Sequence, residues 1–172
     1  MRSYNMNDHQ EYMRHALIHA QTALDAGEFP VGCVLVSAGK IIAAGRRINS
    51  RDDDANELDH AEIISLRNLF THNPQIDRST ITAYSTMEPC LMCYASLLLN
   101  GIRTIVYGYE DIMGGGTSLD LSQLPVLYNE MQATIIPHVL RQESLTLFKA
   151  FFSKPENQYW QGSPLARYTL QQ

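Results

Sequence analysis

The sequence predicts one α/β domain with three layers, α/β/α, built on a central mixed sheet of about five strands. Short apolar or alternating segments typical of strands are separated by segments with the three- and four-residue spacing of amphipathic helices. The chain has 172 residues, of which 45% are hydrophobic, which is enough for one substantial core but short for two. Together these observations favour a single layered domain.

The first three elements are a helix and a hairpin. Over residues 8–27 apolar side chains such as Tyr12 and Ala16 recur at helical spacing, and Gly27 provides a stop. Residues 31–36 and 40–45 are short runs joined by a small-residue turn, which predicts an antiparallel pair of strands. The first run is almost wholly apolar, so we expect it to be a central strand covered on both faces.

A strand, a helix and a second strand form the middle of the predicted fold. Residues 46–59 are polar and aperiodic, which indicates a loop, and residues 60–70 regain helical spacing. Residues 80–86 alternate as a strand, Pro89 opens a helix that runs to about residue 99, and residues 103–108 form the next strand. A strand, helix, strand order implies a parallel pair joined by a right-handed crossover.

The C-terminal part contains fewer clear elements. The glycines of residues 114–118 indicate a flexible turn, residues 132–136 a short strand and residues 139–152 a helix. Residues 1–153 are expected to form the catalytic domain. Residues 154–172 carry Tyr159, Trp160 and Tyr168 between prolines and a glycine, so we expect an ordered extension that could act as a lid.

The composition limits the class of protein. Thirteen basic and 18 acidic residues give a net charge of −5, which offers no support for binding a nucleic acid backbone. Three cysteines do not make a disulfide framework and suggest metal binding or free thiols in a reducing compartment. No export signal or membrane-length apolar segment is visible, so we expect a cytoplasmic protein with no membrane contact.

Two short motifs carry the chemistry: His60-Ala61-Glu62 and, about thirty residues later, Pro89-Cys90-Leu91-Met92-Cys93. Each motif is ambiguous alone, since a Cys-x-x-Cys also occurs in redox pairs and in structural zinc sites. Together they supply one imidazole and two thiolates. A catalytic Zn²⁺ site uses three such protein ligands and keeps one position open. We therefore predict that His60, Cys90 and Cys93 bind zinc.

Glu62 is the predicted catalytic residue. It follows the histidine ligand by two residues, at the start of the same helix, and a carboxylate there can accept a proton from water and deliver it to a leaving amine. Cys33 lies in an apolar strand and is interpreted as a core residue.

These motifs resemble the cytidine and deoxycytidylate deaminase superfamily, whose signature is this His-x-Glu with Pro-Cys-x-x-Cys. Within it the chain is most similar to bacterial tRNA adenosine deaminases. Further segments that carry the likeness, which runs from about residue 11 to residue 118, are Met13-Arg14-His15-Ala16-Leu17, Phe29-Pro30-Val31-Gly32 and Ile105-Val106-Tyr107-Gly108.

The resemblance implies a cytidine-deaminase-like fold, zinc as cofactor, a homodimer or higher oligomer, and a nucleobase-containing substrate. It also implies a hydrolytic reaction that replaces an exocyclic amine by oxygen and releases ammonia. Asn49 occupies the position of an asparagine that hydrogen-bonds the target base. The residues expected to bind substrate are Asn49, Phe29, Val31, Ala61, Glu88 and Pro89.

Three hypotheses for the substrate stay open. The first is the wobble adenosine of tRNA, flipped out of the anticodon loop. The second is a free base, nucleoside or nucleotide of guanine or cytosine type, because Arg167 is the only basic residue after Lys154 and the aromatic extension could close over a small molecule. The third is a zinc-stabilised binding module without turnover, against which the presence of Glu62 argues.

Overall fold

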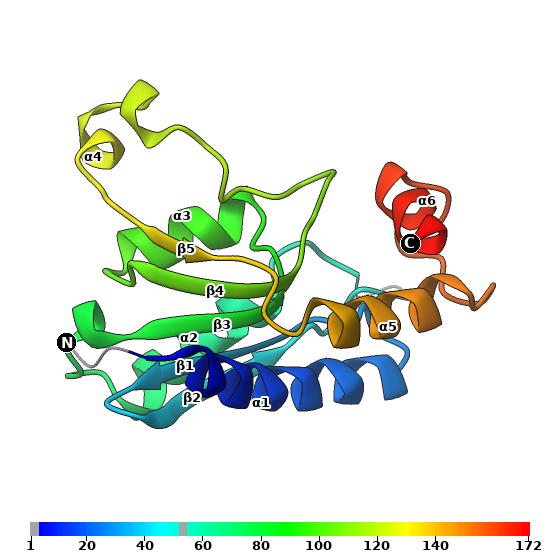
Figure 1. The fold of residues 1–172 in the computed structure, drawn as a ribbon, viewed down its shortest axis with the longest axis horizontal. Coiled ribbons are helices and arrows are strands. Elements are labelled where there is room, and N and C mark those ends of the chain that lie inside the picture. The colour runs from blue at the N-terminus through cyan, green and yellow to red at the C-terminus, as the bar shows by residue number, and fades with distance from the viewer. Residues whose placement is uncertain (1–3, 52–54) are drawn as a thin grey trace.

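A five-stranded sheet lies between two layers of helices in the computed structural model, which describes residues 4–51 and 55–172 (Figure 1). The strand order is β2-β1-β3-β4-β5. β1 pairs antiparallel with β2 and β3, whereas β3 with β4 and β4 with β5 are parallel. The strands are β1 Gly32–Ser37, β2 Lys40–Arg46, β3 Thr82–Met87, β4 Thr104–Tyr109 and β5 Thr134–Ile136. The predicted mixed sheet is confirmed.

Helices cover both faces of this sheet. α1 and α5 pack side by side against one face, and α2 and α3 cover the other (Figure 1). The α-helices are α1 Met6–Asp25, α2 Ala61–His72, α3 Leu91–Leu99, α4 Val126–Asn129, α5 Arg141–Phe152 and α6 Pro164–Gln171, and the 3-10 helices are η1 Arg78–Thr80 and η2 Leu121–Gln123. Among the described residues, no helix is both long enough and apolar enough to cross a membrane.

β1 is a central strand, as its apolar sequence predicts. All six of its residues are buried, and it lies between β2 and β3. Val34 and Val36 join the core under α1, whereas Cys33 and Leu35 belong to the core on the other face. α1 lies so close to Gly32 that a Cβ atom on this residue would be 2.1 Å from the carbonyl oxygen of Ala16. Only glycine permits this approach.

Helix boundaries differ from the predicted ones by one or two residues. α1 begins at Met6 rather than near residue 8, because Asn5 and Asp8 cap its first turn reciprocally. α2 and α3 begin one and two residues later than predicted, so that His60 and Cys90 are their N-cap residues. Both residues have extended backbone, which precedes the first helical turn and leaves their side chains outside the helix.

The glycine-rich segment after β4 is held in place, whereas the sequence suggested a flexible turn. The Gly116 N–H donates to the Pro89 carbonyl oxygen at 2.9 Å, and Cys90 and Gly115 form an isolated bridge. A Cβ atom at Gly116 would lie 2.8 Å from the backbone N and Cα atoms of Leu91, the first residue of α3. Glycine is therefore required here because this segment packs closely against the start of α3.

The C-terminal extension, residues 154–172, ends in α6. Ser163 caps this helix and Pro164 is its first residue. Leu165 and Ala166 are buried in the main core. Tyr168 donates a hydrogen bond to Glu110 at 2.7 Å, and Arg141 donates two to the same carboxylate. The extension is thus packed onto the domain.

We expect the Glu110 contacts to weaken in acid. Burial alone would raise the pKa of Glu110, but hydrogen bonds from Arg141 and Tyr168 outweigh it and lower the pKa to about 2. Because its pKa is lowered, the Glu110 carboxylate stabilises the fold at pH values above its ordinary pKa of 4.5. That stability is lost as the pH falls towards about 2. Glu110→Gln should cost about 1–3 kcal/mol of unfolding free energy at pH 7. The measurement is urea unfolding at several pH values.

The difference between wild type and Glu110→Gln should shrink as the pH falls from 4.5 towards 2. A difference that is constant over this range would contradict the role assigned to Glu110.

The predicted polar loop of residues 46–59 contains no helix, and no strand beyond Arg46, in its described part. Residues 52–54 of that loop lie outside the described residues.

Candidate active site

His60, Cys90 and Cys93 come together at the starts of two neighbouring helices. Nδ1 of His60 lies 3.6 Å from Sγ of Cys90 and 3.5 Å from Sγ of Cys93, and the three candidate ligand atoms all lie within 4.8 Å of one another. His60 and Cys90 are the N-caps of α2 and α3, and Cys93 belongs to the first turn of α3. The two motifs, which are separate in the sequence, thus form a single cluster in the fold.

The geometry of this cluster fits a tetrahedral zinc ion. Zinc bonds of about 2.3 Å to sulfur and about 2.0 Å to nitrogen, at tetrahedral angles, separate nitrogen from sulfur by about 3.5 Å. The two observed nitrogen–sulfur distances agree with this value. One imidazole and two thiols also match the ligand chemistry that zinc prefers.

The two thiols differ in acidity. Hydrogen bonds from Cys93 and His60 lower the pKa of Cys90 to about 4, against the opposing effect of burial. The hydrogen bond to Cys90, together with burial, raises the pKa of Cys93. Thiols bind a divalent cation as thiolates, so metal binding here would release protons.

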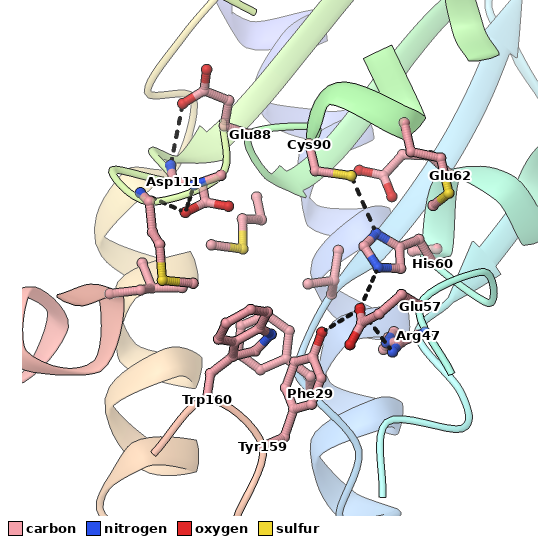
Figure 2. A pocket seen from close by; sticks show the side chains of 17 residues that line it. Phe29, Arg47, Glu57, His60, Glu62, Glu88, Cys90, Asp111, Tyr159 and Trp160 are labelled. Carbon is pink, nitrogen blue, oxygen red and sulfur yellow. Dashed lines mark hydrogen bonds and ion pairs between the residues drawn. The ribbon is translucent and has the colours of Figure 1, made fainter. Parts of the chain in front are cut away.

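Glu62 lies beside the cluster on the first turn of α2 (Figure 2). Its side chain is buried, and burial raises the pKa of its carboxyl group. The Ser85 hydroxyl on β3 donates to Oε1 of Glu62 at 2.9 Å. A carboxyl group held in place with a raised pKa is suited to accepting a proton and giving it up again.

A cavity of about 380 Å³ opens in front of these residues, within the range of about 300–1,000 Å³ usual for small-ligand sites. His60, Glu62 and Cys90 lie on one side of it, and Tyr159 and Trp160 of the C-terminal extension on another (Figure 2). The rest of the lining is mainly apolar: Phe29, Val31, Ala61, Met87, Met92, Met113 and Leu165. Such walls suit a planar aromatic ring.

The predicted substrate-binding residues do not all reach this cavity. Phe29, Val31, Ala61 and Glu88 line it, whereas Asn49 and Pro89 are not among its lining residues.

Asn49 has left-handed backbone, with φ of 53°, and its amide donates to Asp59 at 2.8 Å. The Glu88 carboxylate accepts from the backbone N–H groups of Asp111 and Thr117. The roles of Asn49 and Glu88 towards a substrate stay predictions.

Several residues of the site were not predicted from the sequence. Ser85 gives no signal, because a serine in an alternating strand is unremarkable until its partner is known. Arg47 and Glu57 lie in the polar loop, where charged residues are usually solvated. The structure places both at the cavity wall, and Arg47 has only 2% of its side chain exposed. Only tertiary structure brings these three residues to the site.

Comparison with known proteins identifies the family. Residues 6–109 match the family described as the cytidine and deoxycytidylate deaminase zinc-binding region. The chain belongs to this family. It is a zinc-dependent deaminase that hydrolyses an exocyclic amine of a nucleobase.

Relatives of this deaminase include enzymes that act on tRNA. The chain is 34% identical over 149 residues to the tRNA-specific adenosine deaminase of Bacillus subtilis (strain 168), covering 86% of this chain and 90% of the relative. A structure from a study of A-to-I editing by tRNA:A34 deaminases superposes with a TM-score of 0.69 and 28% identity, covering 80% of this chain and 98% of the other.

The guanine deaminase of Nitrosomonas europaea has the same fold, with a TM-score of 0.66, 19% identity and 83% of each chain covered.

Proposed function

We propose that this deaminase converts adenosine to inosine at the wobble position of tRNA, with Glu62 as the proton-transfer residue and His60, Cys90 and Cys93 as zinc ligands. The observation that carries the proposal is the position of Glu62, buried beside a His-Cys-Cys cluster of zinc-binding geometry and facing a cavity. The tRNA-specific relatives support the choice of substrate.

The residues of the site divide the reaction between them. When bound, zinc lowers the pKa of a water molecule to near neutrality. The Glu62 carboxylate accepts the two protons of the attacking water in turn and delivers one to the ring nitrogen and one to the departing amine. The water oxygen becomes the carbonyl oxygen of the base, and the amine leaves as ammonia. Ser85 holds Oε1 of this carboxylate. The apolar walls keep the base in place and exclude other water.

The substrate is tested by incubating the purified protein with total tRNA and measuring inosine, in parallel with a panel of free bases, nucleosides and nucleotides. We expect inosine in tRNA from the wild type and formation of inosine that is slower by about 10²–10⁴-fold with Glu62→Gln. Absence of inosine together with turnover of guanine or a cytosine compound would contradict the tRNA proposal.

A second candidate substrate, a free base or nucleoside, is favoured by the C-terminal extension. Tyr159 and Trp160 form part of the cavity wall, which agrees with the predicted lid. Deleting the chain after Pro155 should therefore raise KM for a small substrate. Unchanged kinetics on small substrates would remove the support for a lid.

We further propose that the protein is a homodimer located in the cytoplasm. Leu91 and Leu99 at the two ends of α3 are 56% and 50% exposed, and a second copy would cover such apolar side chains. The unpaired cysteines suit a reducing compartment. Light scattering of the purified protein tests the oligomeric state, and a mass of 19.4 kDa would indicate a monomer.

A further inference from the structure

The Glu57 carboxylate connects three parts of the chain at the edge of the cavity (Figure 2). Its Oε2 atom lies 3.2 Å from Nε2 of His60 and accepts a hydrogen bond from the Tyr159 hydroxyl at 2.8 Å. Nη2 of Arg47 lies 3.6 Å from the same oxygen. The start of α2, the end of β2 and the C-terminal extension therefore meet at one carboxylate oxygen.

The contact with His60 fixes the imidazole in a useful orientation. Nδ1 of His60 faces the two sulfurs, and Nε2 on the opposite side of the ring faces Glu57. A carboxylate at Nε2 stabilises the tautomer that carries its proton there, which leaves the lone pair of Nδ1 free for a metal. Residues in this position behind a histidine ligand commonly set metal affinity.

Tyr159 holds Glu57 in place for this contact. The Glu57 side chain is 61% exposed, so without a partner it would sample several rotamers. Tyr159 is itself fixed, because its ring packs 5.1 Å from that of Phe29 and the guanidinium carbon of Arg47 lies 5.5 Å from its centroid. The position of the carboxylate thus depends on the docking of the extension.

We propose that Tyr159 is a positioning residue that acts through Glu57 on His60, so that docking of the C-terminal extension strengthens zinc binding. The inference rests on the zinc ligands of the proposed function, but not on the identity of the substrate. Because coupling between two binding events is reciprocal, zinc must in turn stabilise the docked extension by the same factor.

Zinc affinity, measured by competition with a chromophoric chelator, tests the proposal without any substrate. Glu57→Ala should weaken zinc binding by about 10–100-fold. Tyr159→Phe keeps the ring and removes only the hydroxyl, so we expect a loss of about 2–10-fold. In the double variant, adding Tyr159→Phe to Glu57→Ala should not weaken zinc binding further, because the partner of the hydroxyl is already absent.

Tyr168→Phe is the matched control. It removes a tyrosine hydroxyl from the same extension, also bonded to a glutamate, but Glu110 contacts Arg141 rather than His60. Zinc affinity should stay at the wild-type value, because the buried Leu165 and Ala166 still hold the extension in the core and the hydrogen bond from Tyr159 to Glu57 remains. An equal loss in Tyr168→Phe and Tyr159→Phe, or wild-type affinity in both Tyr159→Phe and Glu57→Ala, would overturn the proposal.

Hydrogen exchange tests the reciprocal effect. Zinc should slow amide exchange around Tyr159 in the wild type and in Tyr168→Phe, but much less in Glu57→Ala. Equal protection in all three proteins would contradict the coupling. Failure of the proposed function can be told apart from failure of this inference. If Cys93→Ala still bound zinc, the assigned zinc ligands would be wrong. If the wild type bound zinc tightly but had no deaminase activity, the proposed function would be wrong and the positioning role of Tyr159 would remain.

Discussion

Replacing Glu62 with glutamine is expected to lower kcat by about 10²–10⁴-fold, the usual contribution of a general acid–base residue. Glutamine has nearly the same shape and can still accept the hydrogen bond that Ser85 donates to Oε1, but it cannot accept a proton from water. Since Glu62 is not among the three zinc ligands, the variant should retain one zinc per chain. Steady-state kinetics and metal analysis of the same preparation measure both properties.

The same substitution should stabilise the metal-free protein at neutral pH. Burial raises the pKa of Glu62 above its ordinary value of 4.5. The stability that this carboxyl group contributes is therefore present below pH 4.5 and is lost as the pH rises through the raised pKa of the folded protein. Glutamine carries no charge and avoids this loss. A variant that retains wild-type kcat, or that unfolds more easily at pH 7, would contradict the role of a buried proton-transfer residue.

Cys93→Ala should remove zinc and activity together. Cys93 is fully buried at the cluster, and its loss leaves two protein ligands in place of three. We expect less than stoichiometric zinc after dialysis, and a fall in kcat/KM of at least about 10³-fold, since a metal centre supplies several kcal/mol of catalysis. Added zinc should raise the melting temperature of the wild type but not that of the variant.

Cys33→Ala is the control for this experiment. Cys33 is also fully buried, but it lies in β1, and burial raises the pKa of its thiol. The variant should lose some packing energy and still bind one zinc. If Cys33→Ala lost zinc as Cys93→Ala does, the assignment of the ligands would be wrong.

Much of the fold follows from sequence periodicity, because the elements that build it are strongly patterned. The apolar run of β1 predicted a central strand, and the order of β3, α3 and β4 predicted a parallel pair, which the structure confirms. Short elements were missed. α4 has only four residues, and α6 could have been predicted from the capping residue Ser163 followed by Pro164.

The candidate zinc cluster and part of the cavity wall were predictable, but the hydrogen bonds around the cluster were not. His60, Cys90 and Cys93 belong to local motifs whose spacing alone suggests a common ion. Ser85 and Tyr159 form hydrogen bonds with residues that are distant in sequence, at separations of 23 and 102 residues respectively. Whether these residues reach the site depends on the register of the strands and on the path by which the chain end returns to the cavity. Neither of these produces a periodic pattern in the sequence.

The path of the chain end brings residues from two distant parts of the sequence to one cavity. The reactive groups sit on two helix starts near the middle of the sequence, whereas part of the cavity wall comes from the last nineteen residues, 154–172. The reactive groups and this part of the cavity wall are thus encoded in separate stretches of the gene. Because Leu165 and Ala166 of this ending are buried in the main core, a different ending grafted onto residues 1–153 would have to supply apolar side chains in their place as well as a new cavity wall.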